Sequence, residues 1–104
     1  MFIYSLYNRT DNRHEFFTGI KGVTKFLRSQ NSGGQILMRN RLSENVYDIT
    51  ADNLQMIFAA AKEEVSEGVG GVAIFTIRWK FMWMEYETEY ALSEQYVEED
   101  EIEE

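Results

Sequence analysis

The sequence predicts an α+β domain in which an antiparallel sheet packs against two helices. Three observations predict it: an N-terminal hairpin pattern, two stretches with amphipathic helical spacing, and a long alternating stretch over residues 72–90. A chain of 104 residues with 44% apolar side chains can bury one modest core. We expect a single domain over residues 1–97, followed by an acidic, disordered tail over residues 98–104.

The first elements are a hairpin and a helix. Residues 2–7 and 14–17 are rich in aromatic and β-branched side chains, and a polar, turn-forming stretch separates them. From residue 18 the spacing becomes that of a helix, which ends in the polar loop 29–34. The apolar side of this helix comprises Ile20, Val23, Phe26 and Leu27.

Residues 35–42 fit neither period, so helix and strand both remain open there. The second helix is expected over residues 51–67. Thr50 or Asp52 can cap its start, and Gly68 can end it. Its apolar stripe comprises Leu54, Ile57, Phe58, Ala61 and Val65.

Residues 72–90 form the strongest strand pattern of the chain. Apolar side chains occupy odd positions as far as Phe81 and even positions from Met82 onwards. Because side chains alternate with a period of two, this change of phase requires a bulge, a bend or a tight turn. We therefore expect either two antiparallel strands or one long bent strand, in the same sheet as the N-terminal hairpin.

The charge of the chain is split between its two parts. Residues 1–41 carry seven Lys or Arg against two acids, whereas residues 42–104 carry three against sixteen, and the formal net charge is −8. Crowding carboxylates does not stabilise a fold, because like charges repel. A charged partner explains this field better than the core does.

Few residues with catalytic potential are present. The chain has no cysteine and a single histidine, His14, which gives little basis for nucleophilic or zinc catalysis. The glycines of residues 68–71 precede a strand rather than open a helix, which is the wrong context for a phosphate site. We expect a non-enzymatic protein without cofactor or metal. The sequence shows no signal peptide or membrane span, so we expect a cytoplasmic protein.

Glu85, Glu87 and Glu89 form a row on one face of the predicted strand, with carboxylates about 6.6 Å apart. No base follows Lys80, and tyrosine, a residue enriched at interfaces, lies among the acids. The expected partner-binding surface comprises Glu63, Glu64, Glu67, Glu85, Tyr86, Glu87, Glu89, Tyr90, Glu94 and Tyr96.

In size, lack of cysteine and its acidic, tyrosine-bearing stretch over residues 82–104, the chain resembles small phage-encoded anti-defence proteins. These include anti-CRISPR proteins and anti-restriction DNA mimics. The resemblance implies a protein that acts in the host cytoplasm, occupies the basic groove of a Cas effector or restriction enzyme, and does not bind DNA itself. The basic N-terminal part departs from a pure mimic. It could touch an acidic or RNA-bearing part of the target, or the acidic part of a second copy in a homodimer.

Two other functions remain open. If residues 35–42 are helical, residues 20–42 resemble a helix-turn-helix that binds nucleic acid. The bases available for that role are Lys21, Lys25, Arg28, Arg39 and Arg41. A net charge of −8 opposes this alternative, since affinity for nucleic acid depends on neutralising phosphates. The third possibility is an interaction domain of unknown partner.

Overall fold

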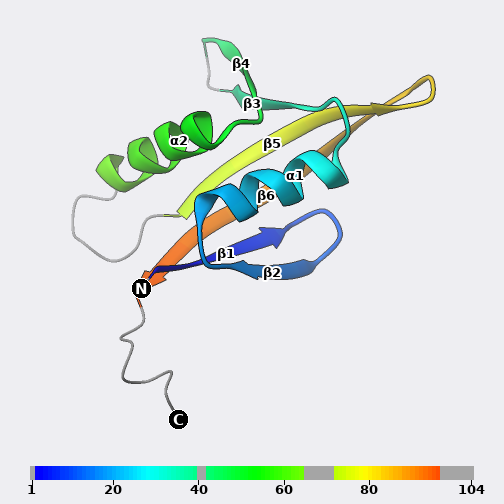
Figure 1. Ribbon diagram of the computed structural model, residues 1–104. Coiled ribbons are helices and arrows are strands. Elements are labelled where there is room, and N and C mark those ends of the chain that lie inside the picture. Colours follow the sequence, from blue (N-terminus) through cyan, green and yellow to red (C-terminus); the bar gives the residue numbers. More distant parts are fainter. Residues whose placement is uncertain (1, 40–41, 65–71, 97–104) are drawn as a thin grey trace.

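The computed structural model describes residues 2–39, 42–64 and 72–96 of the chain (Figure 1). Six strands and two helices make up these residues, which confirms the expected α+β class. In chain order the elements are β1 (Phe2–Asn8), β2 (Arg13–Phe17), α1 (Ile20–Gln30), β3 (Gln35–Arg39), β4 (Glu44–Asp48), α2 (Ala51–Glu64), β5 (Val72–Phe81) and β6 (Met84–Tyr96).

The strands form one antiparallel sheet in the order β2-β1-β6-β5-β3-β4. The predicted N-terminal hairpin is confirmed as β1 and β2. The first and last strands, β1 and β6, are neighbours inside the sheet, with Phe2 opposite Tyr96. The side chains that both helices bury lie in one cluster on one face of the sheet. Among the described residues, the other face carries no helix.

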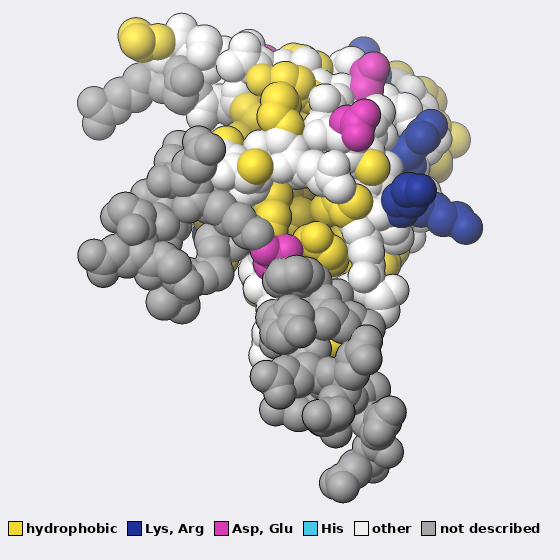
Figure 2. Space-filling model, turned by 60° about the vertical axis from the view of Figure 1, so that its left-hand side comes forward, with side chains coloured by type: hydrophobic (Ala, Val, Ile, Leu, Met, Phe, Trp, Pro, Cys, Tyr) yellow, Lys and Arg dark blue, Asp and Glu magenta, His cyan; other side chains and the backbone are white. Residues whose placement is uncertain are grey.

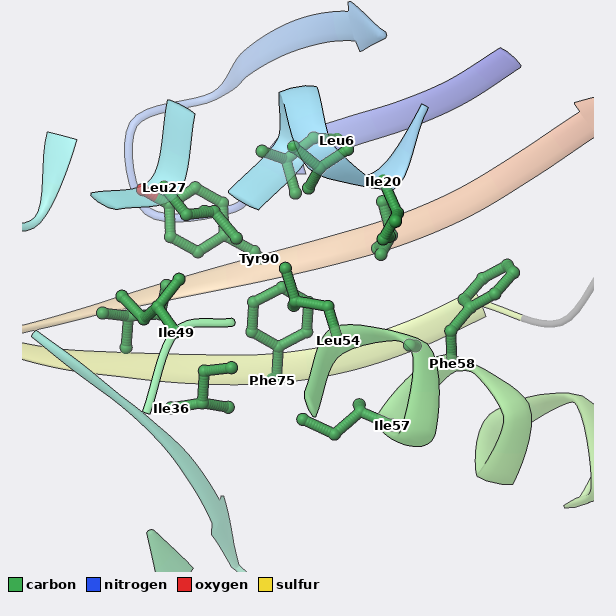
Figure 3. Close-up of a cluster of buried hydrophobic side chains, with 14 residues drawn as sticks. Leu6, Ile20, Leu27, Ile36, Ile49, Leu54, Ile57, Phe58, Phe75 and Tyr90 are labelled. Carbon is green, nitrogen blue, oxygen red and sulfur yellow. The ribbon is translucent and has the colours of Figure 1, made fainter. Parts of the chain in front are cut away.

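The core lies between this sheet face and the two helices (Figure 3). Leu27 of α1 and Leu54 of α2 point toward Phe75 of β5 and Tyr90 of β6, and each of the four is at most 2% exposed. Full burial of an apolar side chain of this size stabilises the fold by about 1.5–3 kcal/mol. This cluster therefore holds the helices to the middle of the sheet.

The phase change near Met82 is a tight turn between two antiparallel strands. β5 and β6 pair along their length, and only Met82 and Trp83 connect them. This register places odd residues opposite even ones, as in the pair Phe75 and Tyr90, so the buried positions are odd in β5 and even in β6. The alternative with two strands is confirmed, and β6 continues past the expected end at residue 90.

A buried polar side chain ends α1. Asn31 is 1% exposed, and its Nδ2 donates hydrogen bonds of 3.0 Å to the Leu27 carbonyl and to the Tyr90 hydroxyl. The loop then passes close to its neighbours, because a Cβ on Gly34 would lie 2.8 Å from the Asn31 carbonyl oxygen and 3.0 Å from Ile77 Cγ2. These contacts place β3 beside β5.

Gln35–Arg39 is a strand, which decides the question left open for residues 35–42. The helix-turn-helix alternative is therefore wrong, because it required a helix at this position. The short edge strand β4 was not predicted. Four of its five residues are exposed, so no alternation of apolar side chains marks it in the sequence.

The second helix is confirmed from Ala51 to Glu64. Its first turn is capped by Thr50, because the Asn53 amide donates a 3.1 Å hydrogen bond to Thr50 Oγ1. The expected helix end at Gly68 and the expected tail over residues 98–104 lie outside the described residues.

Candidate partner-binding surface on the C-terminal hairpin

The end of the β5–β6 hairpin extends beyond the rest of the sheet (Figure 1). β3 pairs with β5 only as far as Arg78, and β1 pairs with β6 only as far as Tyr90. In residues 79–86 the two strands therefore have only each other as described strand partners.

The glutamate row lies along this hairpin, on the sheet face that carries no described helix. Glu85, Glu87 and Glu89 alternate with the inward-facing residues of β6, and their side chains are 49, 38 and 44% exposed. Directly opposite them on β5 are Lys80, Arg78 and Thr76. The arrangement on one face is the one that the strand period predicts.

Arginines from other elements neutralise much of this row. Arg39 Nη1 and Nη2 donate to the two oxygens of Glu87 at 3.0 and 2.9 Å, and Arg39 Nε donates to Glu44 at 3.1 Å. Arg78 lies 3.3 Å from Glu85 and 3.7 Å from Glu87. Arg78 Nε has no aligned hydrogen bond, so its contact with Glu85 is electrostatic.

No base follows the row in the sequence, but the fold gives it basic neighbours in space. Glu89 also has a partner, Arg9, with Nη1 and Oε1 2.9 Å apart. The strand order explains the difference, because it brings β3 next to β5 and the β1–β2 loop next to β6. Arg9 and Arg39 precede the row by many residues in the chain and face it only after folding.

The bidentate pair shifts the titration of both its members. Hydrogen bonds to Glu87, and next to Glu44, raise the pKa of the Arg39 guanidinium. The hydrogen bonds from Arg39 lower the pKa of the Glu87 carboxyl below its ordinary value of 4.5, against a smaller opposing effect of burial. Both groups therefore stay charged at neutral pH, and solvent screens the energy of the pair because the groups are exposed.

The described part of the chain is close to neutral. The residues whose side chains the structure describes include eight Lys or Arg and nine Asp or Glu, a balance of −1. Six of the eighteen acids belong to residues 97–104, which lie outside the described residues. Most of the acidic excess therefore belongs to residues outside this described set.

The other residues of the expected surface do not all join the row. Tyr90 was expected at the surface but is 2% exposed, because even positions of β6 face the helices. Burial raises the pKa of its hydroxyl, which accepts a hydrogen bond from Asn31. Tyr86 shares this parity and stacks on Trp79 with ring centroids 4.8 Å apart. Glu94 also shares it and therefore lies on the face opposite the row.

The remaining acids and bases are distributed as follows. The side chains of Glu63, Glu64 and Tyr96, and all of Glu67 and Arg41, lie outside the described set. Three bases of α1 are exposed and line a shallow hollow with Thr24 and Ala51: Lys21, Lys25 and Arg28. Arg39 does not line this hollow and instead pairs with Glu44 and Glu87.

Sequence reasoning missed the apolar tip of the hairpin. Residues 81–84, here called the tip, are Phe81, Met82, Trp83 and Met84, with exposures of 59, 75, 88 and 53%. Two-residue turns favour Gly, Asn and Asp, and Met82 has a φ of 58°, which is strained for a residue with a Cβ. The sequence did contain a signal for this surface. It places apolar residues at a predicted tight turn, and folding alone does not require apolar residues there.

Among the described residues, no three His, Cys, Asp or Glu side chains are placed to hold a metal ion. His14 is exposed, with its ring centroid 4.4 Å from that of Tyr7. None of the described helices has the length and apolar character needed to cross a membrane.

Comparisons with protein families, curated proteins and solved structures found no match for this chain.

Proposed function

We propose that this chain is a non-enzymatic inhibitor that binds a basic nucleic-acid-handling protein, such as a Cas effector or a restriction enzyme, and blocks its access to nucleic acid. The observation that carries the proposal is the glutamate row, whose exposed carboxylates have ordered positions on the sheet face that carries no described helix. Carboxylates in such an array can receive the Lys and Arg side chains that otherwise contact phosphates.

The arginines give the members of the row different roles. Glu87 uses both carboxylate oxygens on Arg39, so it fixes the geometry of the network. The ion pairs of Glu85 and Glu89 each involve Oε1, and a carboxylate can accept further hydrogen bonds at its second oxygen. Glu85 and Glu89 are therefore the members that receive the partner's cations. Because they are already ordered, they lose little conformational entropy on binding.

The net charge of −8 supplies the longer-range attraction to a basic partner. The side chains that the structure describes are almost neutral in sum, so this attraction comes mainly from the remaining acids. Attraction of this kind increases the association rate and weakens as salt rises. The remaining acids thus favour encounter, and the row determines the bound arrangement.

The test is a DNA mobility-shift assay with a panel of purified Cas effector complexes and restriction enzymes, each with and without this chain. We expect the chain to reduce DNA binding by its target, less so at high salt, and to give no shift with DNA alone. The variant Glu85→Lys with Glu89→Lys should lose most of this inhibition. Its matched control is Glu15→Lys with Asp52→Lys, which makes the same charge change at exposed sites away from the β5–β6 hairpin.

Two results would contradict the proposal. Equal loss in both double variants would show that net charge alone matters and that the row has no specific role. Inhibition that is independent of salt and of both variants would show that binding uses another surface.

A further inference from the structure

A second feature of the chain, independent of the glutamate row, is an apolar groove. β3 pairs with β5 only from Gln35 to Leu37. Beyond Leu37 the two strands do not pair, and a groove of about 600 Å³ lies between β3, β4, α2 and the start of β5. Figure 2 faces this end of the molecule and shows hydrophobic side chains open to the surface. The groove is lined chiefly by Met38, Tyr47, Met56, Ile57, Ala60 and Ile74.

The chain thus carries a convex apolar tip and a concave apolar groove, and it cannot join them within one copy. Ile74 lines the groove and Phe81 begins the tip, and both belong to β5. Seven residues of extended strand separate them by about 23 Å. Figure 1 shows the start of β5 and the hairpin turn at opposite ends of the sheet. The tip can therefore reach only the groove of another copy.

We propose that the protein associates head to tail, with the tip of one copy seated in the groove of the next. The tip is narrow, because paired strands lie about 4.8 Å apart, and Trp83 at its end is the most exposed of its four side chains. Two convex tips cannot cover each other, whereas a groove can enclose one. The methionines on both surfaces, among them Met82 and Met56, adapt their shape to the contact.

The area of the two surfaces agrees with a second copy as the occupant. With about 150–250 Å² for each large aromatic side chain, tip and groove together would bury about 1,000 Å². That area is at the lower limit for a specific interface, so the association is weak and depends on concentration.

A head-to-tail contact uses different surfaces on the two copies, so it produces rings or growing chains instead of a closed two-fold dimer. Sedimentation velocity of the full chain over a range of concentrations tests this. We expect the average mass to rise with concentration and to pass that of a dimer. Trp83→Ala and Met56→Glu should each remain monomeric, and Phe16→Ser should associate as the wild type does. Phe16 is a matched control, since it is 67% exposed and lies outside tip and groove.

Mixing the two monomeric variants identifies the contact. The Trp83→Ala copy keeps its groove and the Met56→Glu copy keeps its tip, so the mixture should form a one-to-one heterodimer that neither variant forms alone. Circular dichroism of each variant checks that it is folded. The fluorescence of Trp83 in the Met56→Glu copy should shift to shorter wavelength when Trp83→Ala protein is added.

Three results would overturn the proposal. A wild type that stays monomeric at the highest attainable concentration excludes self-association through this contact. Folded variants that fail to combine, while the wild type stops at a dimer, indicate a two-fold contact instead. Binding of the wild type to phosphatidylcholine vesicles, lost in Trp83→Ala and without self-association, would assign the tip to a bilayer. None of these results bears on the DNA-binding assay, so the proposed function is tested separately.

Discussion

Arg39 and Glu87 form a bidentate ion pair across an intervening strand. Arg39 is on β3 and Glu87 on β6, with β5 between them, and their two hydrogen bonds are 3.0 and 2.9 Å long. Leu37 lies on the same face by strand alternation and is 2% exposed, although no described helix covers this face. The burial of Leu37 on this face thus comes from neighbours other than a described helix.

Replacing Arg39 should change the titration of Glu87. In Arg39→Met the pKa of the Glu87 carboxyl should rise toward its ordinary value of 4.5, because its main hydrogen-bond donor is lost. Since the folded-state pKa of the wild type is lowered, the pair stabilises the fold above the unfolded pKa. That contribution is lost as pH falls through the folded pKa. NMR titration of the Glu87 side chain measures the shift.

Arg9→Met is the control for this prediction, because Arg9 pairs with Glu89 and not with Glu87. The free energy of unfolding of wild type and Arg39→Met should differ at neutral pH and converge in acid. A difference that persists unchanged in acid would mean that Arg39 acts through packing alone.

The buried bond between Asn31 and Tyr90 should contribute measurably to stability. Tyr90→Phe removes the hydroxyl but leaves Asn31 Nδ2 bonded to the Leu27 carbonyl. We expect a loss of about 1 kcal/mol in the free energy of unfolding, and a larger loss of about 2–3 kcal/mol for Asn31→Ala, which removes both bonds. Urea denaturation measures both values. Equal losses would indicate that the hydroxyl carries the whole effect.

Gly34 should not tolerate a side chain. In Gly34→Ala the new Cβ would lie 2.8 Å from a backbone oxygen and 3.0 Å from Ile77, so the loop must shift. We expect a loss of about 1–3 kcal/mol in the free energy of unfolding. Gly19→Ala is the matched control, because a Cβ there meets nothing within 4 Å. If thermal denaturation gave the same result for both variants, the close approach at Gly34 would have no energetic importance.

The strained turn predicts a gain in stability. Met82 has a φ of 58°, a conformation that Asn adopts more readily than Met. Met82→Asn should therefore increase the free energy of unfolding by about 0.5–1 kcal/mol. Met84→Asn, in the adjoining strand, should give no such gain. Thermal unfolding at low concentration limits the self-association proposed above. A loss of stability in Met82→Asn would show that the methionine side chain contributes to the fold, against its assignment to a contact with another copy.

Local patterns determined most of the elements. The hairpin at the N-terminus, both helices and the β5–β6 turn are visible in the sequence, because one buried face gives each a readable period. The strand Gln35–Arg39 was not visible in the sequence. Its neighbouring residues Ile36 and Leu37 face opposite sides of the sheet, and they are 0 and 2% exposed, so both sides of this strand are buried. A strand buried on both faces shows no alternation, so only its pairing with β4 and β5 reveals it.

The sequence by itself determined the spacing of Glu85, Glu87 and Glu89, because the period of a strand is a local property. Only the tertiary structure decided what faces them. Glu87 meets Arg39, 48 residues away in the chain, and Glu89 meets Arg9 of the first hairpin. Charge counted along a chain reports neighbours in sequence, whereas Coulomb interactions depend on distance in space. The strand order β6-β5-β3 sets that distance.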